Sequence, residues 1–174
     1  MPEKKAKKIV KRNQANEERE LRRQLTNLLK GGGAHVQFDD ALDGLPANKR
    51  GAFAPGLPHT AWQLVEHMRL AQWDVLEFTR NPKHVSPEFP EGYWPPTPSP
   101  KNNNEWDRAV RDFKKNLREM IRLVQDPRSN LFLPIKHGQG QSILREALIL
   151  ADHNSYHLGQ LVCLRRALRT WPEG

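Results

Sequence analysis

The helix that decides the fold is predicted by residues 60–80, which read TAWQLVEHMRLAQWDVLEFTR. Thr60 precedes Gln63 by three residues, the spacing of a capping box, in which each side chain bonds the backbone N–H of the other residue. Apolar residues recur at helical spacing on more than one face, so we expect much of this helix to be buried. Asn81-Pro82 ends the helix, because the residue before a proline avoids helical backbone angles.

The same apolar periodicity predicts three further long helices and one short helix. Each of them is bounded by glycine, proline or a capping side chain. No stretch has the pattern of a strand, so the predicted fold class is all-α, a four-helix bundle. The predicted ranges are residues 16–30, the short stretch 36–44, the stretch from the caps offered by Asn102 to Asn104, with Glu105 three residues after Asn102, as far as Asp126, and residues 143–168 after an N-cap at Ser142.

The connection that follows residue 80 is long and rich in proline. Residues 81–101 hold seven prolines and an EGYWPP segment, a composition that excludes a helix. A helix of about 21 residues is about 31 Å long, and an extended chain of about 22 residues can return along that whole length. The second and third long helices are therefore expected to run parallel, joined by a Pro-rich crossover.

Composition restricts the class of protein. The chain of 174 residues is long enough for one domain, and its single cysteine excludes an intramolecular disulfide framework and any metal site that needs two thiolates of one chain. It contains no run of eighteen apolar residues, so no transmembrane helix is predicted. The N-terminus is charged where a signal peptide is apolar, which makes a cytoplasmic location the expectation.

Most of the net charge of +8 lies in the first dozen residues, MPEKKAKKIVKR, which hold six basic side chains and one acidic side chain. Residues 1–15 are expected to form a basic tail, disordered or fraying, ahead of a single domain over residues 16–174. Lys and Ala would also allow this segment to extend the first helix. The tail lacks aromatic residues for base stacking and no nucleic-acid-binding signature follows it, so nucleic acid is not the expected partner.

Three of the seven histidines fall inside predicted long helices. His153 and His157 are spaced i, i+4, which places both imidazoles on one helix face, the spacing by which one helix offers two nitrogens to a metal. His67 lies in an apolar part of its helix, where an imidazole needs a partner. Two interpretations stay open: a metal site shared by the three histidines, or separate histidines that face water or hydrogen-bond in the core. No Glu stands between residues 153 and 157, which disfavours a metalloprotease of the HExxH type.

Two motifs resemble the DinB-like superfamily, whose members include proteins described as metal-dependent hydrolases. They are HTAWQLVEHMRLAQWDVLEF at residues 59–78 and REALILADHNSYHLGQLVCLRR at residues 145–166, and the resemblance extends over roughly residues 20–168. It implies a four-helix bundle with up-down-down-up topology, a homodimer, and a divalent metal held by His67, His153 and His157. Some relatives carry a pocket histidine in the loop before a short helix, where this chain has His35, which could also be an ordinary loop residue.

The chemistry expected at such a site follows from its donors. Three neutral imidazoles leave coordination positions open, as in catalytic sites, and zinc, nickel and iron all accept imidazole. The expected function is a metal-dependent enzyme acting on a small molecule, either a hydrolase or a thiol-dependent transferase, since a Lewis acid can activate water or a thiol. The alternative is a non-catalytic metal-binding or stress-response bundle, because the sequence identifies no general base. The candidates for lining the pocket are His35, Gln63, Tyr93, Trp94 and Gln160.

Overall fold

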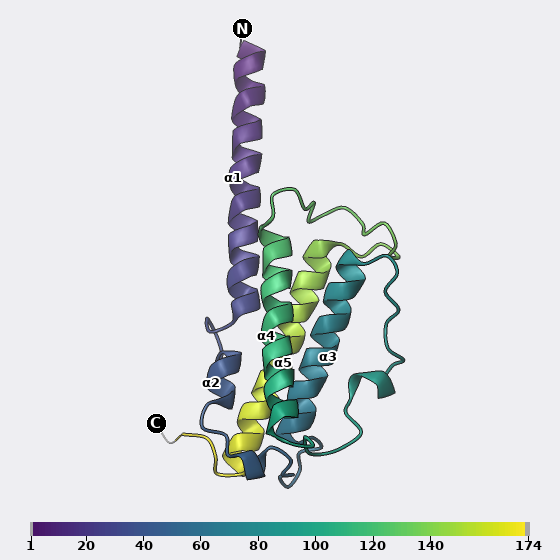
Figure 1. The fold of residues 1–174 in the computed structure, drawn as a ribbon. Helices are drawn as coiled ribbons and strands as arrows, with labels where there is room; N and C mark the ends of the chain where they lie inside the picture. Colours follow the sequence, from purple (N-terminus) through teal and green to yellow (C-terminus); the bar gives the residue numbers. More distant parts are fainter. Residues whose placement is uncertain (1, 173–174) are drawn as a thin grey trace.

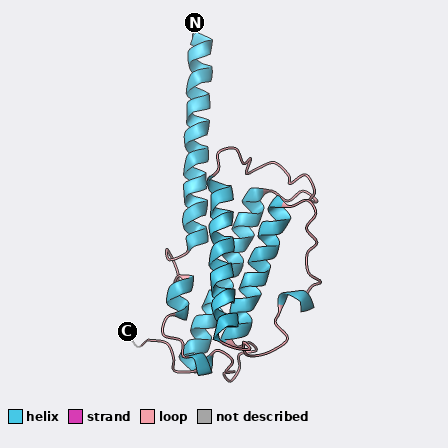
Figure 2. Cartoon of the chain, in the orientation of Figure 1, coloured by secondary structure: helices cyan, strands magenta, loops and turns pink. Residues whose placement is uncertain are grey.

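The chain is all-helical over the residues that the structure describes, as the sequence predicts (Figure 2). The computed structural model describes residues 2–172, with side chains from residue 13 onward, and this range contains no strand. None of the described helices is both long enough and apolar enough to cross a membrane. The helices are α1 (Pro2–Lys30), α2 (Phe38–Leu42), α3 (Ala61–Arg80), α4 (Asn103–Gln125) and α5 (Ile143–Ala167), with single 3₁₀ turns η1 (Ala47–Lys49) and η2 (Glu91–Tyr93).

The predicted capping residues set the starts of three long helices. At α3 the Thr60 side chain accepts the backbone N–H of Gln63 at 3.2 Å, and the Gln63 side chain accepts the backbone N–H of Thr60 at 3.0 Å. Asn102 accepts the N–H of Glu105 at 3.0 Å, and Ser142 accepts the N–H three residues later at 3.3 Å. Each cap satisfies a backbone donor that the helix itself leaves free, which is why these starts could be predicted locally.

The first helix begins earlier than predicted. α1 starts at Pro2 rather than near residue 16, so the basic segment extends the first helix. Lys and Ala favour helix, and proline is tolerated in a first turn, where its missing N–H would have no helical partner. Figure 1 shows the N-terminal part of α1 extending past the other helices, and the first buried residue among the described side chains of α1 is Arg22. Among the described side chains of α1, burial in the bundle therefore begins in its C-terminal part.

The four long helices pack side by side along most of their length. Figure 1 shows α3 and α4 running in one direction and α1 and α5 in the other. The segment between Arg80 and Asn103, which we call the crossover, returns along the outside of the bundle to join α3 to α4. α3 packs against α4 and α5, and α1 packs against the same two helices. This order places the middle of α3 opposite the middle of α5.

Two clusters of buried apolar side chains fill the bundle. One surrounds Trp62, Met68 and Phe113, and the other surrounds Leu76 and Met120. α3 contributes to both clusters, so a large part of its apolar surface is buried within the chain. Burial of these faces is the main source of stability, because an isolated helix of this length is marginal in water.

The crossover is fixed to the bundle near its C-terminal end. The Thr60 hydroxyl donates to the carbonyl of Pro98 at 2.6 Å, and Trp94 packs against the cluster around Trp62. The turn η2 contacts α3. Irregular backbone from the crossover therefore lies over the part of α3 that carries His67.

Candidate metal centre

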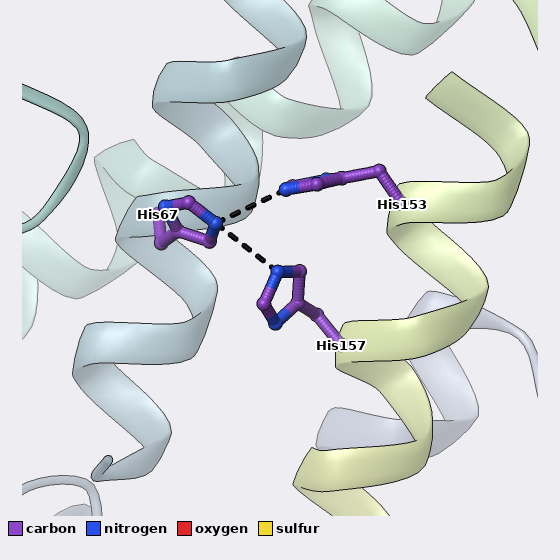
Figure 3. A group of neighbouring side chains, drawn as sticks. All are labelled: His67, His153 and His157. Atoms are coloured by element: carbon purple, nitrogen blue, oxygen red, sulfur yellow. Dashed lines mark hydrogen bonds between the residues drawn. The ribbon is translucent and has the colours of Figure 1, made fainter. Parts of the chain in front are cut away.

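Three histidines converge between α3 and α5. His67 comes from α3, and His153 and His157 lie one turn apart on α5 (Figure 3). The Nε2 atom of His67 lies 3.0 Å from Nε2 of His153 and 3.1 Å from Nε2 of His157. One ligand atom from each ring lies within 4.8 Å of the others, the arrangement that a single ion requires. His67 and His157 are buried and His153 is half-buried.

The outward nitrogens of two of these rings have hydrogen-bond acceptors. Nδ1 of His67 lies 2.9 Å from the backbone carbonyl oxygen of Tyr93, and Nδ1 of His157 lies 2.8 Å from Oε1 of Gln160. A carbonyl oxygen only accepts, so Nδ1 of His67 carries the proton, and with the Gln160 amide oriented in this way Nδ1 of His157 is assigned the proton as well. Metal-binding histidines are oriented in this way, with one nitrogen donating to an outer acceptor. Nδ1 of His153 is buried and has no hydrogen-bond partner.

The assigned tautomers leave two lone pairs facing each other. A neutral imidazole that is protonated at Nδ1 has a bare lone pair at Nε2. His153 can donate an Nε2 proton to His67, but the 3.1 Å contact between Nε2 of His67 and Nε2 of His157 then contains no proton. Two lone pairs at this distance repel unless a cation lies between them. The donor set therefore fits a divalent metal better than it fits a hydrogen-bonded cluster.

The environment keeps the three imidazoles neutral. Burial lowers the pKa of His67 to about 4, partly opposed by the hydrogen bond to Tyr93 and assisted by neighbouring imidazoles. Burial and the two neighbouring rings lower the pKa of His153 to about 4, and burial also lowers the pKa of His157. Metal ligation needs neutral imidazole, so at neutral pH no proton has to be removed before a metal binds.

An aromatic stack covers one face of His67. The Trp94 ring is parallel to the His67 ring, with 3.9 Å between centroids and 1° between planes. The His59 ring stacks on Trp94 with 4.0 Å between ring centroids. Burial lowers the pKa of His59. His59 was not predicted as a site residue, because a histidine just before a helix cap has no spacing that relates it to the other three.

The predicted pocket residues lie in three different places. Tyr93 and Trp94 contact His67, and Gln160 contacts His157. Gln63 forms the cap of α3 through its side-chain oxygen. His35 lies elsewhere: its Nε2 is 2.9 Å from Oγ of Ser155, which points away from His153 and His157 on the opposite side of α5. His35 is therefore not brought to the three-histidine group, and it borders a groove between α1 and α5 instead.

A buried carboxylate lies farther along α3 and was also missed by sequence reasoning. Asp74 accepts a hydrogen bond from the Tyr93 hydroxyl at 2.7 Å and contacts Nε2 of His84 at 2.7 Å. Burial and the hydrogen bond to Asp74 raise the pKa of Tyr93 to about 12, so the hydroxyl remains a donor. A single Asp in an amphipathic helix resembles a surface residue, and only its burial distinguishes it.

Comparison with known proteins gives one match. The model of the DinB superfamily matches residues 33–161, a range that includes His67, His153 and His157. No curated protein and no solved structure matches the chain. The matched range spans well over half of the chain and contains α2 to most of α5. The chain thus belongs to the DinB superfamily.

Proposed function

We propose that the chain is a metal-dependent enzyme that binds one divalent ion through His67, His153 and His157 and acts on a small molecule, as a hydrolase or a thiol-dependent transferase. The observation that carries the proposal is the 3.1 Å contact between two Nε2 atoms whose outer nitrogens both face acceptors. Membership of the DinB superfamily supports the same reading.

The residues of the chain supply the binding and the orientation. Tyr93 and Gln160 hold the rings of His67 and His157 with Nε2 pointing inward. Trp94 covers one face of His67, which limits access of water from that side. A divalent ion at this position would supply a Lewis acid for water or for a thiol, and zinc, nickel and iron all suit three imidazoles.

The small number of protein donors favours a catalytic site over a structural one. Among the described residues, no Asp, Glu or Cys joins the three histidines in the candidate group. Structural zinc sites use four protein ligands, whereas catalytic sites keep a position open. The group of three histidines also supplies no carboxylate of its own that could act as a general base. A non-catalytic metal-binding or stress-response protein is therefore the alternative that the experiment has to separate.

Cobalt substitution tests whether a position is open to a substrate. We expect the visible absorption spectrum of the Co²⁺-loaded protein to change when a small thiol such as 2-mercaptoethanol is added, because the thiolate can enter the open position. The His67→Ala variant, treated identically, controls for thiol binding to free or loosely held cobalt. A spectrum that small thiols and other small ligands leave unchanged would favour the non-catalytic alternative.

We also propose that the chain forms a homodimer. A large part of the apolar surface of α3 is buried within the chain, so the support comes from large apolar side chains exposed elsewhere. Leu28 on α1 is 48% exposed, and Leu148 and Tyr156 on α5 are 44% and 64% exposed. Light scattering at micromolar concentration should report about twice the chain mass of 20.1 kDa. The monomer mass alone would argue against a stable dimer.

A further inference from the structure

One buried carboxylate attaches the crossover to α3. Asp74 is only 8% exposed, and its two oxygens are used by two residues of the crossover. Oδ2 accepts the Tyr93 hydroxyl at 2.7 Å, and Oδ1 lies 2.7 Å from Nε2 of His84. The His84 ring packs edge-on against Trp73, with 5.0 Å between ring centroids. A carboxylate without partners would be costly to bury, so these two bonds fix the position of the crossover.

Tyr93 links this carboxylate to the candidate metal centre. Its hydroxyl donates to Asp74, and its backbone carbonyl accepts the Nδ1 proton of His67 at 2.9 Å. The next residue, Trp94, stacks on His67. Asp74 follows His67 by seven residues, which is about two turns on the same face of α3. One short piece of crossover therefore provides both the acceptor and the stacked ring that surround His67.

The crossover has little internal structure that could hold Tyr93 in place. Between Arg80 and Asn103 its only helical turn is η2, which ends at Tyr93 itself. Backbone of this kind is usually the most mobile part of a fold, and a metal ligand needs a fixed ring orientation. The attachment of Tyr93 to a rigid helix through Asp74 meets that need.

We propose that Asp74 is a positioning residue for the metal ligand His67: by fixing the Tyr93 side chain, it places the Tyr93 carbonyl and the Trp94 ring so that Nε2 of His67 points at the metal. This inference rests on the proposed metal-binding function and adds an outer layer to it. The competing explanation is that Asp74 only stabilises the fold.

The test compares Zn²⁺ affinity in variants that break the Asp74–Tyr93 bond. Tyr93→Phe removes the hydroxyl and keeps the backbone carbonyl, and Asp74→Ala removes both acceptors. Loss of an outer-layer partner usually weakens metal binding by about 10–100-fold, so we expect about tenfold for each variant. The double variant should be little worse than either single variant, because both remove the same link. Asp74→Asn, which can accept from Tyr93 and donate to His84, should retain most of the affinity.

Two controls separate positioning from stability. Met120→Ala opens a cavity in the buried apolar cluster around Leu76 and Met120, so it should lower the melting temperature without changing Zn²⁺ affinity. In the metal-free protein, NMR should detect a protected Nδ1 proton of His67, assigned by its absence in His67→Ala. We expect that proton to exchange faster in Tyr93→Phe than in the unaltered chain.

The outcomes are distinct. Unchanged Zn²⁺ affinity and unchanged proton exchange in Tyr93→Phe would overturn the inference, even if Asp74→Ala fails to fold. If the unaltered chain binds none of Zn²⁺, Ni²⁺ and Fe²⁺ through His67, the proposed function fails, and the positioning role toward a metal fails with it. Weaker binding in Tyr93→Phe with a normal melting temperature would support the positioning role.

Discussion

Replacing His157 by alanine is expected to remove the increase in melting temperature that a divalent metal gives to the unaltered chain. A ligand present at about 100 times its Kd stabilises a fold by about 2.7 kcal/mol. For a domain of this size each kcal/mol corresponds to about 2–4 °C, so the unaltered chain should gain about 5–11 °C with Zn²⁺. Two remaining imidazoles bind far more weakly than three, and His157→Ala should gain almost nothing. Thermal unfolding with and without Zn²⁺ measures both values.

His35→Ala is the matched control for that experiment. It also removes one histidine, but from the opposite side of α5, where the ring contacts Ser155. We expect this variant to keep the full metal-dependent increase. Without metal, His157→Ala should lose little stability, because it also removes the repulsive contact with His67. A metal-dependent increase that persists in His157→Ala would place the metal elsewhere.

The helix boundaries were predictable where local chemistry sets them. The caps at Thr60, Asn102 and Ser142 depend only on residues within the next turn, and they lie where the sequence predicts them. α1 begins well before the predicted residue 16, because the Lys and Ala residues of the basic segment favour helix. A basic segment can be helical without packing on anything, provided its residues favour helix and the helix continues into a packed region.

The candidate site was predictable only where local spacing sets the position of a side chain. The i, i+4 spacing of His153 and His157 fixes their common face on one helix. Whether His67 lies next to them depends on tertiary packing. A shared site for the three histidines was implied by the resemblance to a family and not by their spacing alone. Asp74 and the Tyr93 carbonyl could not be found from the sequence, since the path of the crossover brings them to the site. A backbone acceptor also has no residue type that could reveal it.

The metal-free protein is expected to lose stability as the pH falls from 7 to 5. The pKa of His67 is about 4 in the folded chain and near 6.5 when exposed. Between these values the unfolded chain binds a proton that the folded chain excludes, so the free energy of unfolding decreases as the pH decreases. For His67 alone the loss at pH 5 is about 2 kcal/mol, or about 4–8 °C in melting temperature. His153 and His157 also lower the free energy of unfolding as the pH falls, because their pKa values are lowered in the folded chain.

The contribution of these three histidines can be separated from general acid destabilisation. The triple variant His67→Gln, His153→Gln and His157→Gln replaces each ring by a polar side chain that does not titrate in this range. With a chelator present in both samples, its melting temperature should vary less between pH 7 and pH 5 than that of the unaltered chain. If the melting temperatures of the two proteins fall equally with pH, the three imidazoles accept protons in the folded chain without cost. Burial would then not be holding these rings neutral. A steeper slope in the unaltered chain would support the neutral imidazoles that metal binding requires, because burial opposes protonation of these rings in the fold.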